Sequence, residues 1–354
     1  MSHRLYKIII ALTIVSQGFA EVLVVPKNYA TIQAGLDAAQ EGDTVIVDEG
    51  VYNENIDYYG KNIVLASKFL ETGNPQFIAN TVIKGSNKGE KRSGSVVTFS
   101  GREDSTAALI GFTITKGRAS IGGGIYCNLA NPRLHNLVIK ENRAEKGAGI
   151  GLYESSPEIV NVAILDNLAR WSSAMHITSF SSPTLTNVLI ANNITSFNTG
   201  WIYCESFSSP SFNHVTISGN SAPDPEGEAG EMLRKRYGSI IRARLEGIHI
   251  ANGSHPVFRN SIIWNTTQQE FFVREYGEPS SITIAYSTVD GGTNSIIDKN
   301  EAAEVNWREG NLTDGPQFVA PDDQNYALQS SSPCRGAGEN GDMGMYGGWG
   351  KTSK

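Results

Sequence analysis

Short runs of alternating apolar and polar residues, broken by turn residues, fill most of this chain. The stretch at 155–167, SSPEIVNVAILDN, is typical, because its Ile, Val and Leu positions lie between Ser-Ser-Pro at one end and Asp-Asn at the other. Such runs with turn signals at both ends predict short β-strands. The apolar spacing within these units does not fit a helix.

The same phrase recurs along the chain. Aligned on its proline, it starts at Pro132, Pro157, Pro183, Pro210 and Pro256. Seven positions later comes an isoleucine: Ile139, Ile164, Ile190, Ile217 and Ile263, preceded by Ile114 in a copy without proline. From Ile114 to Ile217 the steps are 25, 25, 26 and 27 residues, a period typical of stacked repeats. A unit this short cannot bury its own apolar face, so the sequence predicts a single-stranded β-solenoid with one copy per coil.

Stacked coils place equivalent residues in columns about 4.8 Å apart. We expect two asparagine columns that hydrogen-bond along the axis. The first contains Asn136, Asn161, Asn187, His214 and Asn260, and the second contains Asn142, Asn167, Asn193, Asn220 and Asn265. Cys127 and Cys204 fall in one inward column three coils apart, too far for a disulfide. Cys334 is left over, so three cysteines make no disulfide framework.

Residues 29–51 break the repeat. Ile32, Leu36 and Ala39 fall on one helical face behind Thr31 as N-cap, and the strand 44–47 follows. An open solenoid end exposes unpaired strand edges, so we expect this helix to cap it. The Gly- and Pro-rich segment 315–350 is the candidate for a second cap.

Composition and charge narrow the class. The chain has 354 residues, 37 of them glycine, and 18% charged residues, which fits a turn-rich β protein. A net charge of −7 argues against general affinity for nucleic acid. Residues 1–20 combine Arg4 and Lys7 with a short apolar run and a small-residue site at 18–20, the pattern of a secretory signal peptide. A retained membrane anchor fits less well because the apolar run is short.

These features resemble a known superfamily. The opening YATIQAGLDAAQEGDTVIVDEGVYNENI is similar to that of secreted right-handed parallel β-helix proteins of the pectin-lyase-like superfamily. The repeats, with GGGIY and GAGI, resemble those of polymorphic outer-membrane proteins, and the tail GPQFVAPDDQNYALQSSSPCRGAG resembles a C-terminal module of bacterial surface proteins. The resemblance implies a right-handed parallel β-helix at residues 21–290 with an insertion at 221–247, and a cap or anchor-type module at 291–354. It leaves function open, since this fold hosts enzymes and adhesins alike.

The catalytic patterns of that superfamily are not recognisable in this sequence. What remains is an outward column on the strand after each Gly-rich turn: Tyr126, Gly151, His176, Tyr203 and His249. The neighbouring outward column contains Tyr153 and Glu205. Tyrosines on a flat sheet can stack on sugar rings, and His176 or His249 could exchange protons with a substrate. The simpler interpretation is a set of exposed, β-favouring surface residues.

The insertion at 221–247 is the only long interruption of the repeat. It carries five basic residues, among them Arg242 and Arg244, just before His249. If folded over the outward face, they could bind the carboxylates of an acidic glycan. The alternative is a solvated loop in which glutamates pair with these cations.

A further column contains Lys116, Glu141 and Asp166. Carboxylates one coil apart could hold Ca²⁺ with an asparagine oxygen. A surface ion pair between Lys116 and Glu141 is the simpler explanation. The sequence indicates no other cofactor.

Two functions follow. The first is a secreted or cell-surface bacterial protein, monomeric and without catalysis, that serves adhesion or binds polysaccharide or a host-surface glycan through Tyr126, Tyr153, Tyr203 and Glu205. The second is a lyase or hydrolase acting on acidic glycan, with Arg242 or Arg244 binding the carboxylate and His176 or His249 moving the proton. The absent catalytic patterns favour the first, and the Arg-rich insertion supports the second.

Overall fold

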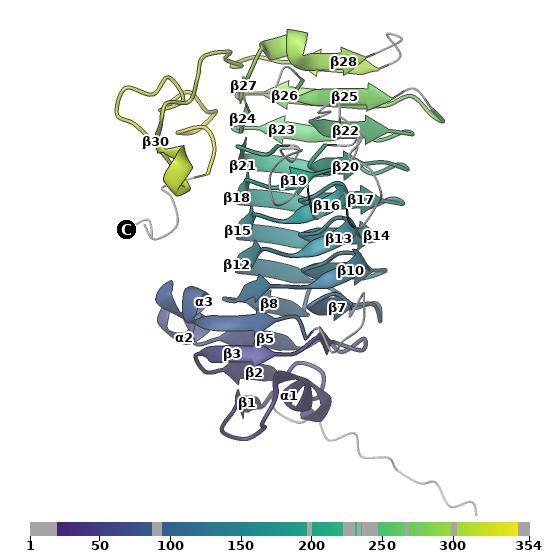
Figure 1. Ribbon diagram of the computed structural model, residues 1–354, viewed down its shortest axis with the longest axis vertical. Coiled ribbons are helices and arrows are strands. Elements are labelled where there is room, and N and C mark those ends of the chain that lie inside the picture. The colour runs from purple at the N-terminus through teal and green to yellow at the C-terminus, as the bar shows by residue number, and fades with distance from the viewer. Residues whose placement is uncertain are drawn as a thin grey trace, which may run out of the picture.

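A computed structural model shows a parallel β-solenoid with a cap at its N-terminal end (Figure 1). The described residues are 20–86, 94–196, 200–221, 231, 235, 247–265, 269–274, 276–298 and 303–345. Successive copies of the repeat pair in parallel along three sheets, as the repeat period predicted. The predicted β-solenoid is therefore confirmed. Among these residues no helix is long and apolar enough to cross a membrane.

The largest sheet, sheet A, has 16 strands. Its main path is β1 (Val22–Val25), β2 (Thr44–Val47), β5 (Val64–Ser67), β8 (Ala108–Ile110), β12 (Arg133–Lys140), β15 (Glu158–Leu165), β18 (Thr184–Ala191), β21 (Ser211–Ser218), β23 (Val257–Arg259), β26 (Ser281–Ala285) and β29 (Glu304–Trp307). Beside this path lie β3 (Gly50–Asn53), β6 (Thr81–Lys84), β9 (Thr113–Thr115), β24 (Ile262–Trp264) and β27 (Thr288–Val289).

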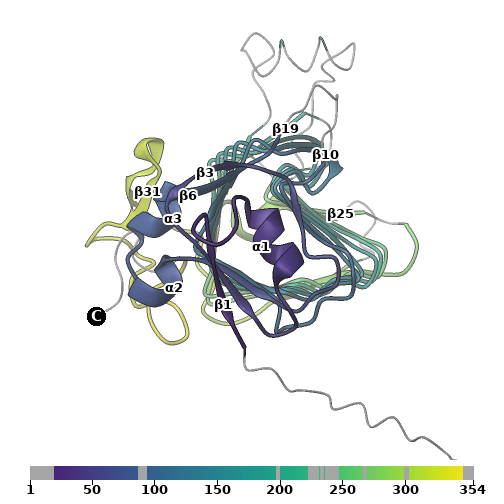
Figure 2. The ribbon, with the colours of Figure 1, turned by 90° about the horizontal axis from the view of Figure 1, so that it is seen from below.

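Two smaller sheets complete each coil. Sheet B contains β4 (Ile56–Asp57), β7 (Val97–Phe99), β11 (Ile125–Asn128), β14 (Ile150–Tyr153), β17 (Met175–Thr178), β20 (Ile202–Cys204), β22 (Ile248–Ala251), β25 (Phe271–Arg274) and β28 (Ile296–Asp298). Sheet C contains β10 (Arg118–Ile121), β13 (Arg143–Lys146), β16 (Leu168–Trp171) and β19 (Ile194–Thr195). The view along the axis shows the three sheets enclosing one core (Figure 2).

The core is built from columns of inward residues. The predicted isoleucine column, Ile114, Ile139, Ile164, Ile190, Ile217 and Ile263, is fully buried at every level. Cys127 and Cys204 lie in one buried column, separated by Leu152 and Ile177, and neither is bonded to another cysteine. Their predicted separation of three coils is confirmed.

The first asparagine column forms a corner within sheet A. Asn136, Asn161 and Asn187 all have φ near +55°, the left-handed region that asparagine tolerates better than most residues. Their amides bond from coil to coil, with Asn161 Nδ2 donating to Asn136 Oδ1 at 3.1 Å. His214 keeps the same backbone conformation but interrupts the amide ladder, so Asn260 donates to Asn213 instead.

The second asparagine column is a continuous buried ladder. Each Nδ2 donates to the Oδ1 of the next coil, at 2.9–3.1 Å from Asn142 to Asn265, and the backbone N–H of each donor residue binds the same oxygen. The ladder ends on a carboxylate, because Asn265 donates its Nδ2 and its backbone N–H to the two oxygens of Glu270, both at 2.7 Å. The coils from Asn142 to Asn265 are thereby fixed to one another at one interior position.

Helix α1 (Ile32–Ala38) closes the N-terminal end. Thr31 Oγ1 accepts the N–H of Ala34, and Ile32, Leu36 and Ala39 are buried against the first coils. Figure 2 shows this helix across the end of the core. The predicted capping helix is therefore confirmed. Two short helices, α2 (Phe69–Thr72) and α3 (Gln76–Asn80), lie on the side of the same end.

The C-terminal module, residues 315–345, does not cap the other end as expected. The solenoid continues through β28 and β29, past the predicted boundary at 290, and η1 (Gly292–Ser295) lies at that end. The module contains η2 (Pro321–Asp323) and the antiparallel pair β30 (Phe318–Ala320) and β31 (Asn325–Leu328). Figure 1 shows it beside sheet A, where it covers the outward apolar residues Leu165 and Leu189.

Candidate functional site

The predicted outward column on sheet B exists in the expected register. Tyr126, Gly151, His176, Tyr203 and His249 are paired in succession, followed by Phe272. The rings stack along the axis, with centroids 5.3 Å apart for His176 and Tyr203 and 4.3 Å apart for Tyr203 and His249. The interpretation of an exposed face is wrong for the histidines, since His176 is 4% exposed and His249 is 0% exposed.

The turn between sheets C and B explains this burial. Gly147 lies directly over His176, because a Cβ on Gly147 would come within 2.9 Å of the Cβ of His176. Ser172 Oγ lies 3.3 Å from His176 Nδ1. Lys146, at the end of β13, opposes a positive charge on this imidazole. His249 lies deeper, between the rings of Tyr203 and Phe272.

Burial, with a smaller contribution from Lys146, lowers the pKa of His176 to about 3. The imidazole is therefore neutral at neutral pH, and the imidazolium form that acts as a general acid is not populated. Its Nε2 lies 3.9 Å from Glu205 Oε1, but without a charge on the ring this is not an ion pair.

We expect the His176 imidazole to stay neutral from pH 8 down to pH 5. The folded environment disfavours its charged form, whereas a histidine in an unfolded chain titrates near pH 6.5. A two-dimensional NMR titration of the ring carbons, assigned with a His176→Gln variant, measures this. The same signal in denaturant is the control, and a midpoint above pH 6 in the folded protein would contradict the expectation.

Glu205 and Tyr203 do form part of a polar cluster at the edge of sheet B. Tyr276 donates its hydroxyl to Glu205 Oε2 at 2.6 Å, and the hydroxyls of Tyr203 and Tyr276 are 3.3 Å apart. Burial and the bond to Glu205 raise the pKa of Tyr276 well above its usual range. Tyr276 is thus a hydrogen-bond donor and not a base.

Exposed aromatic residues surround this cluster. The aromatic corner is defined as Tyr153, Phe180, Phe207 and Tyr276, which are exposed by 41%, 68%, 42% and 42%. Tyr153 ends β14, and the other three lie in the turns that follow β17, β20 and β25. The rings of Phe180 and Phe207 are nearly parallel, with centroids 5.1 Å apart and an interplanar angle of 9°. The two rings stack on each other and form an exposed apolar pair beside hydrogen-bonding groups.

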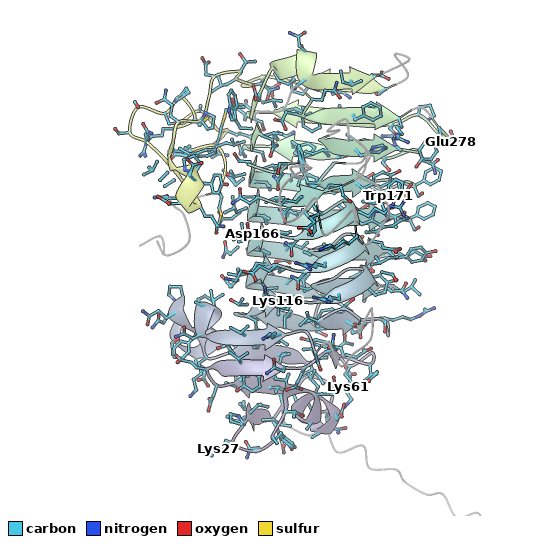
Figure 3. The ribbon with its side chains drawn as sticks, viewed as in Figure 1. Lys27, Lys61, Lys116, Asp166, Trp171 and Glu278 are labelled. Atoms are coloured by element: carbon cyan, nitrogen blue, oxygen red, sulfur yellow. The ribbon has the colours of Figure 1, made fainter. Side chains whose placement is uncertain are left out.

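A small cleft of about 130 Å³ adjoins the corner. Arg274, Tyr276, Glu278 and Asp298 are among the residues that line it. The guanidinium of Arg274 lies 5.6 Å from the centre of the Phe272 ring, which places a cation at the end of the ring column. Figure 3 labels Glu278 on the side of the solenoid opposite Asp166.

Among the described residues, Tyr126, Glu141 and Asp166 do not join this cluster. Arg242 and Arg244 lie outside the described residues. Tyr126 is half-buried, at the other end of the ring column. Glu141 forms an ion pair with Lys116, the simpler of the two explanations considered.

Asp166 accepts a hydrogen bond from Gln324 of the C-terminal module at 3.1 Å. Burial raises the pKa of Asp166, and the carboxylate of Glu141 raises it further. Within the described ranges no three His, Cys, Asp or Glu side chains gather as metal ligands would.

Phe180, Phe207, Arg274 and Tyr276 were not identified from the sequence. The two phenylalanines had a signal, because the phrase SFSSP occurs at both 179–183 and 206–210. Equal offsets in adjacent coils place these rings one above the other. Tyr276 had no such signal, because it is separated from its partner Glu205 by 71 positions in the sequence.

Comparisons with known proteins support the fold. No protein-family model matches the chain, and a search of curated proteins finds no match. Among solved structures, pectate lyase Pel9A gives a TM-score of 0.55 at 12% identity, covering 93% of this chain and 96% of that one. A pectin methylesterase from carrot gives 0.38 at 14% identity over 83% of each chain. An alginate lyase from Paenibacillus sp. gives 0.27 at 13% identity, covering 82% of this chain and 99% of that one.

The similarity to the pectate lyase extends over nearly the whole of both chains. At 12% identity it establishes the fold alone, and the two lower TM-scores carry no argument. The chain is a right-handed parallel β-helix of the pectin-lyase-like fold. Its activity has to be argued from its own residues.

Proposed function

We propose that this protein is a polysaccharide-binding β-helix that acts outside the cell and has no catalytic activity. The observation that carries the proposal is the exposed, parallel pair Phe180 and Phe207 beside the cluster of Glu205, Tyr203 and Tyr276. Large apolar side chains left in water on a rigid scaffold are typical of binding sites. The leader-like sequence of residues 1–20 is the reason for expecting export.

The chemistry of the corner suits a sugar. A pyranose ring has a flat C–H face that packs on an aromatic ring, and hydroxyls at its edge that need donors and acceptors. Phe180 and Phe207 supply a stacked pair of such rings from adjacent coils, and the exposed surface of this pair is available for the contact. Glu205 supplies acceptors, and Tyr276 and Arg274 supply donors. Because the coils repeat along the axis, an extended chain fits this surface better than a single sugar does.

The alternative, a lyase or hydrolase, has less support from these residues. His176 is neutral and buried, and Tyr276 has a raised pKa, so neither offers a proton exchange matched to neutral pH. His249 is enclosed between two rings and is 0% exposed. A binding role for the same cluster does not require any of these groups to gain or lose a proton.

Removing the ring pair Phe180 and Phe207 should weaken polysaccharide binding by at least tenfold. We expect a Phe180→Ala, Phe207→Ala double variant to lose most of its affinity for whichever polysaccharide the wild type retains, because about 1 kcal/mol or more is lost with each exposed ring contact. Affinity electrophoresis on a panel of acidic and neutral polysaccharides measures it. Leu70→Ala is the matched control, since Leu70 is 45% exposed on α2, far from the corner.

A second assay on the same samples separates binding from catalysis. We expect no release of new reducing ends or unsaturated products by the chain from Glu21 onward, with or without calcium. Turnover that a Glu205→Gln substitution abolishes would replace the binding proposal with the enzymatic one. Equal binding by the wild type and the double variant would show that the corner is not the site.

A further inference from the structure

A second hollow lies on the opposite side of the molecule, between sheet A and the C-terminal module. This C-terminal groove has a volume of about 520 Å³, well above the cleft beside the aromatic corner and within the range of about 300–1,000 Å³ usual for ligand sites. Its lining residues are Asn192, Ser218, Gly219, Trp264, Gly315, Pro316, Gln317, Phe318, Pro321, Asp322 and Tyr326. None of them belongs to the site proposed above.

The groove has walls that are fixed in place. Tyr326 donates its hydroxyl to Asn192 Oδ1 at 3.3 Å, which ties β31 to the solenoid. Further along, Met345 N–H donates to Thr216 Oγ1 at 2.9 Å, and Gly344 N–H donates to Asn260 O at 2.7 Å. The module therefore holds its position against sheet A without needing a ligand.

Three aromatic side chains line the groove. Phe318 and Tyr326 pack edge to face, with ring centroids 5.2 Å apart at 85°. The indole of Trp264 is half-buried at the end of β24, and a Cβ on Gly315 would lie 3.4 Å from its Cζ2. Glycine at 315 thus lets the chain pass close to the indole while part of the ring still lines the hollow.

The bond between Tyr326 and Asn192 can be reached from the groove because of Gly219. A side chain on this residue would begin 2.6 Å from Asn192 Oδ1 and 3.1 Å from the Tyr326 hydroxyl. Gly219 has φ of +68°, a conformation that glycine adopts freely. An amide, a hydroxyl and the side chain of Gln317 are therefore available for hydrogen bonds to one ligand.

The charge of the residues that line the groove favours a neutral ligand over an acidic one. Among the described residues that line the groove, Asp322 is the one charged side chain. A second carboxylate, Asp166, lies outside the lining and accepts a hydrogen bond from Gln324, two residues after Asp322. A carboxylate accepts hydrogen bonds from sugar hydroxyls but repels a uronic acid. Aromatic rings combined with amides and one carboxylate suit a neutral, hydroxyl-rich ring.

We propose that the C-terminal groove binds a neutral saccharide, with Trp264 as the stacking residue and Asp322 as an acceptor for its hydroxyls. This site is separate from the aromatic corner. The two sites can be tested separately, so a negative result at one site does not decide the proposal for the other.

Isothermal titration with neutral hexasaccharides of glucose, xylose or mannose tests the proposal, with an oligogalacturonate of equal length for comparison. We expect at least one neutral oligomer to bind, and Trp264→Ala and Asp322→Ala each to weaken it at least fivefold. Asp322 is exposed in η2, so its variant keeps the fold even if Trp264→Ala destabilises the coil. Leu70→Ala, which lies outside the groove lining, is the matched control and should bind as the wild type does. The Phe180→Ala, Phe207→Ala variant is titrated alongside to show which of the two sites holds the oligomer.

Three outcomes would overturn the proposal. One is no binding of any neutral hexasaccharide in the panel. Another is binding that Asp322→Ala leaves unchanged, and the third is binding that only the variant at the aromatic corner loses. The third would support the polysaccharide site at the corner while removing the one in the groove.

Discussion

Replacing Asn167 with alanine should lower the free energy of unfolding by about 3 kcal/mol or more. Asn167 Oδ1 accepts both the backbone N–H and the Nδ2 of Asn142, and its own Nδ2 donates to Asn193 Oδ1 and to Ile139 O. Alanine leaves the backbone N–H of Asn142 and one of its two Nδ2 hydrogens without an acceptor in a dry interior, at about 1–3 kcal/mol for each group. Urea unfolding followed by far-UV circular dichroism measures the loss.

The matched control is Asn161→Gly in the corner column. Asn161 also bonds to its neighbours above and below, but it is half-buried and glycine keeps its positive φ. Water can replace the lost amide there, so we expect a change below about 1 kcal/mol. Equal losses in the two variants would mean that burial of the ladder does not determine its contribution.

The second large effect is a loss of stability as the pH rises, caused by Glu270. Burial raises the pKa of Glu270 to about 7 from 4.5, against the hydrogen bonds from Asn265. Between these two values the folded protein keeps a proton that the unfolded chain has released, so stability falls with increasing pH. By pH 8 the loss should reach about 3 kcal/mol.

Glu270→Gln should flatten this profile, because its side chain carries no charge at any pH. Urea midpoints at intervals from pH 4.5 to pH 8 compare the two proteins. Glu304→Gln removes the same charge from an exposed position on β29 and should leave the slope as in the wild type. A wild-type slope that survives Glu270→Gln would assign the pH dependence to other groups.

The sequence predicts the fold well because each coil repeats the packing of the one before it. The isoleucine column, both asparagine columns, the two cysteines and the Thr31 cap lie where the spacing places them. The repeat period and the alternation of faces are enough to predict the register of the strands. They do not predict which outward residues remain exposed to water.

The burial of His176 shows why. Its position in the outward column follows from the repeat, but its exposure depends on the turn at Gly147, which passes against the backbone and Cβ of His176. The lateral docking of the C-terminal module was missed for a related reason. The second halves of β15 and β18 read VAIL and VLIA, continuous apolar runs that are typical of strands covered on both faces. The repeat alone assigns no covering element to Leu165 and Leu189.

The candidate sites were the least predictable part of the structure, because their residues do not occupy equivalent positions in successive repeats. Tyr276 reaches Glu205 across an intervening coil, and the groove at Trp264 exists only once the C-terminal module has docked. Interactions that depend on such long separations leave no periodic trace in the sequence.

The buried asparagine ladder also gives the solenoid an electrical direction. Every amide from Asn142 to Asn220 points its N–H toward the C-terminal end, so their dipoles add along the axis. Glu270 lies at the positive end of that row, where its two side-chain oxygens accept from Asn265 and the row of amides ends. A longer solenoid could therefore be designed by inserting whole asparagine-bearing coils before Asn265, whereas coils added beyond Glu270 would have to begin a new row.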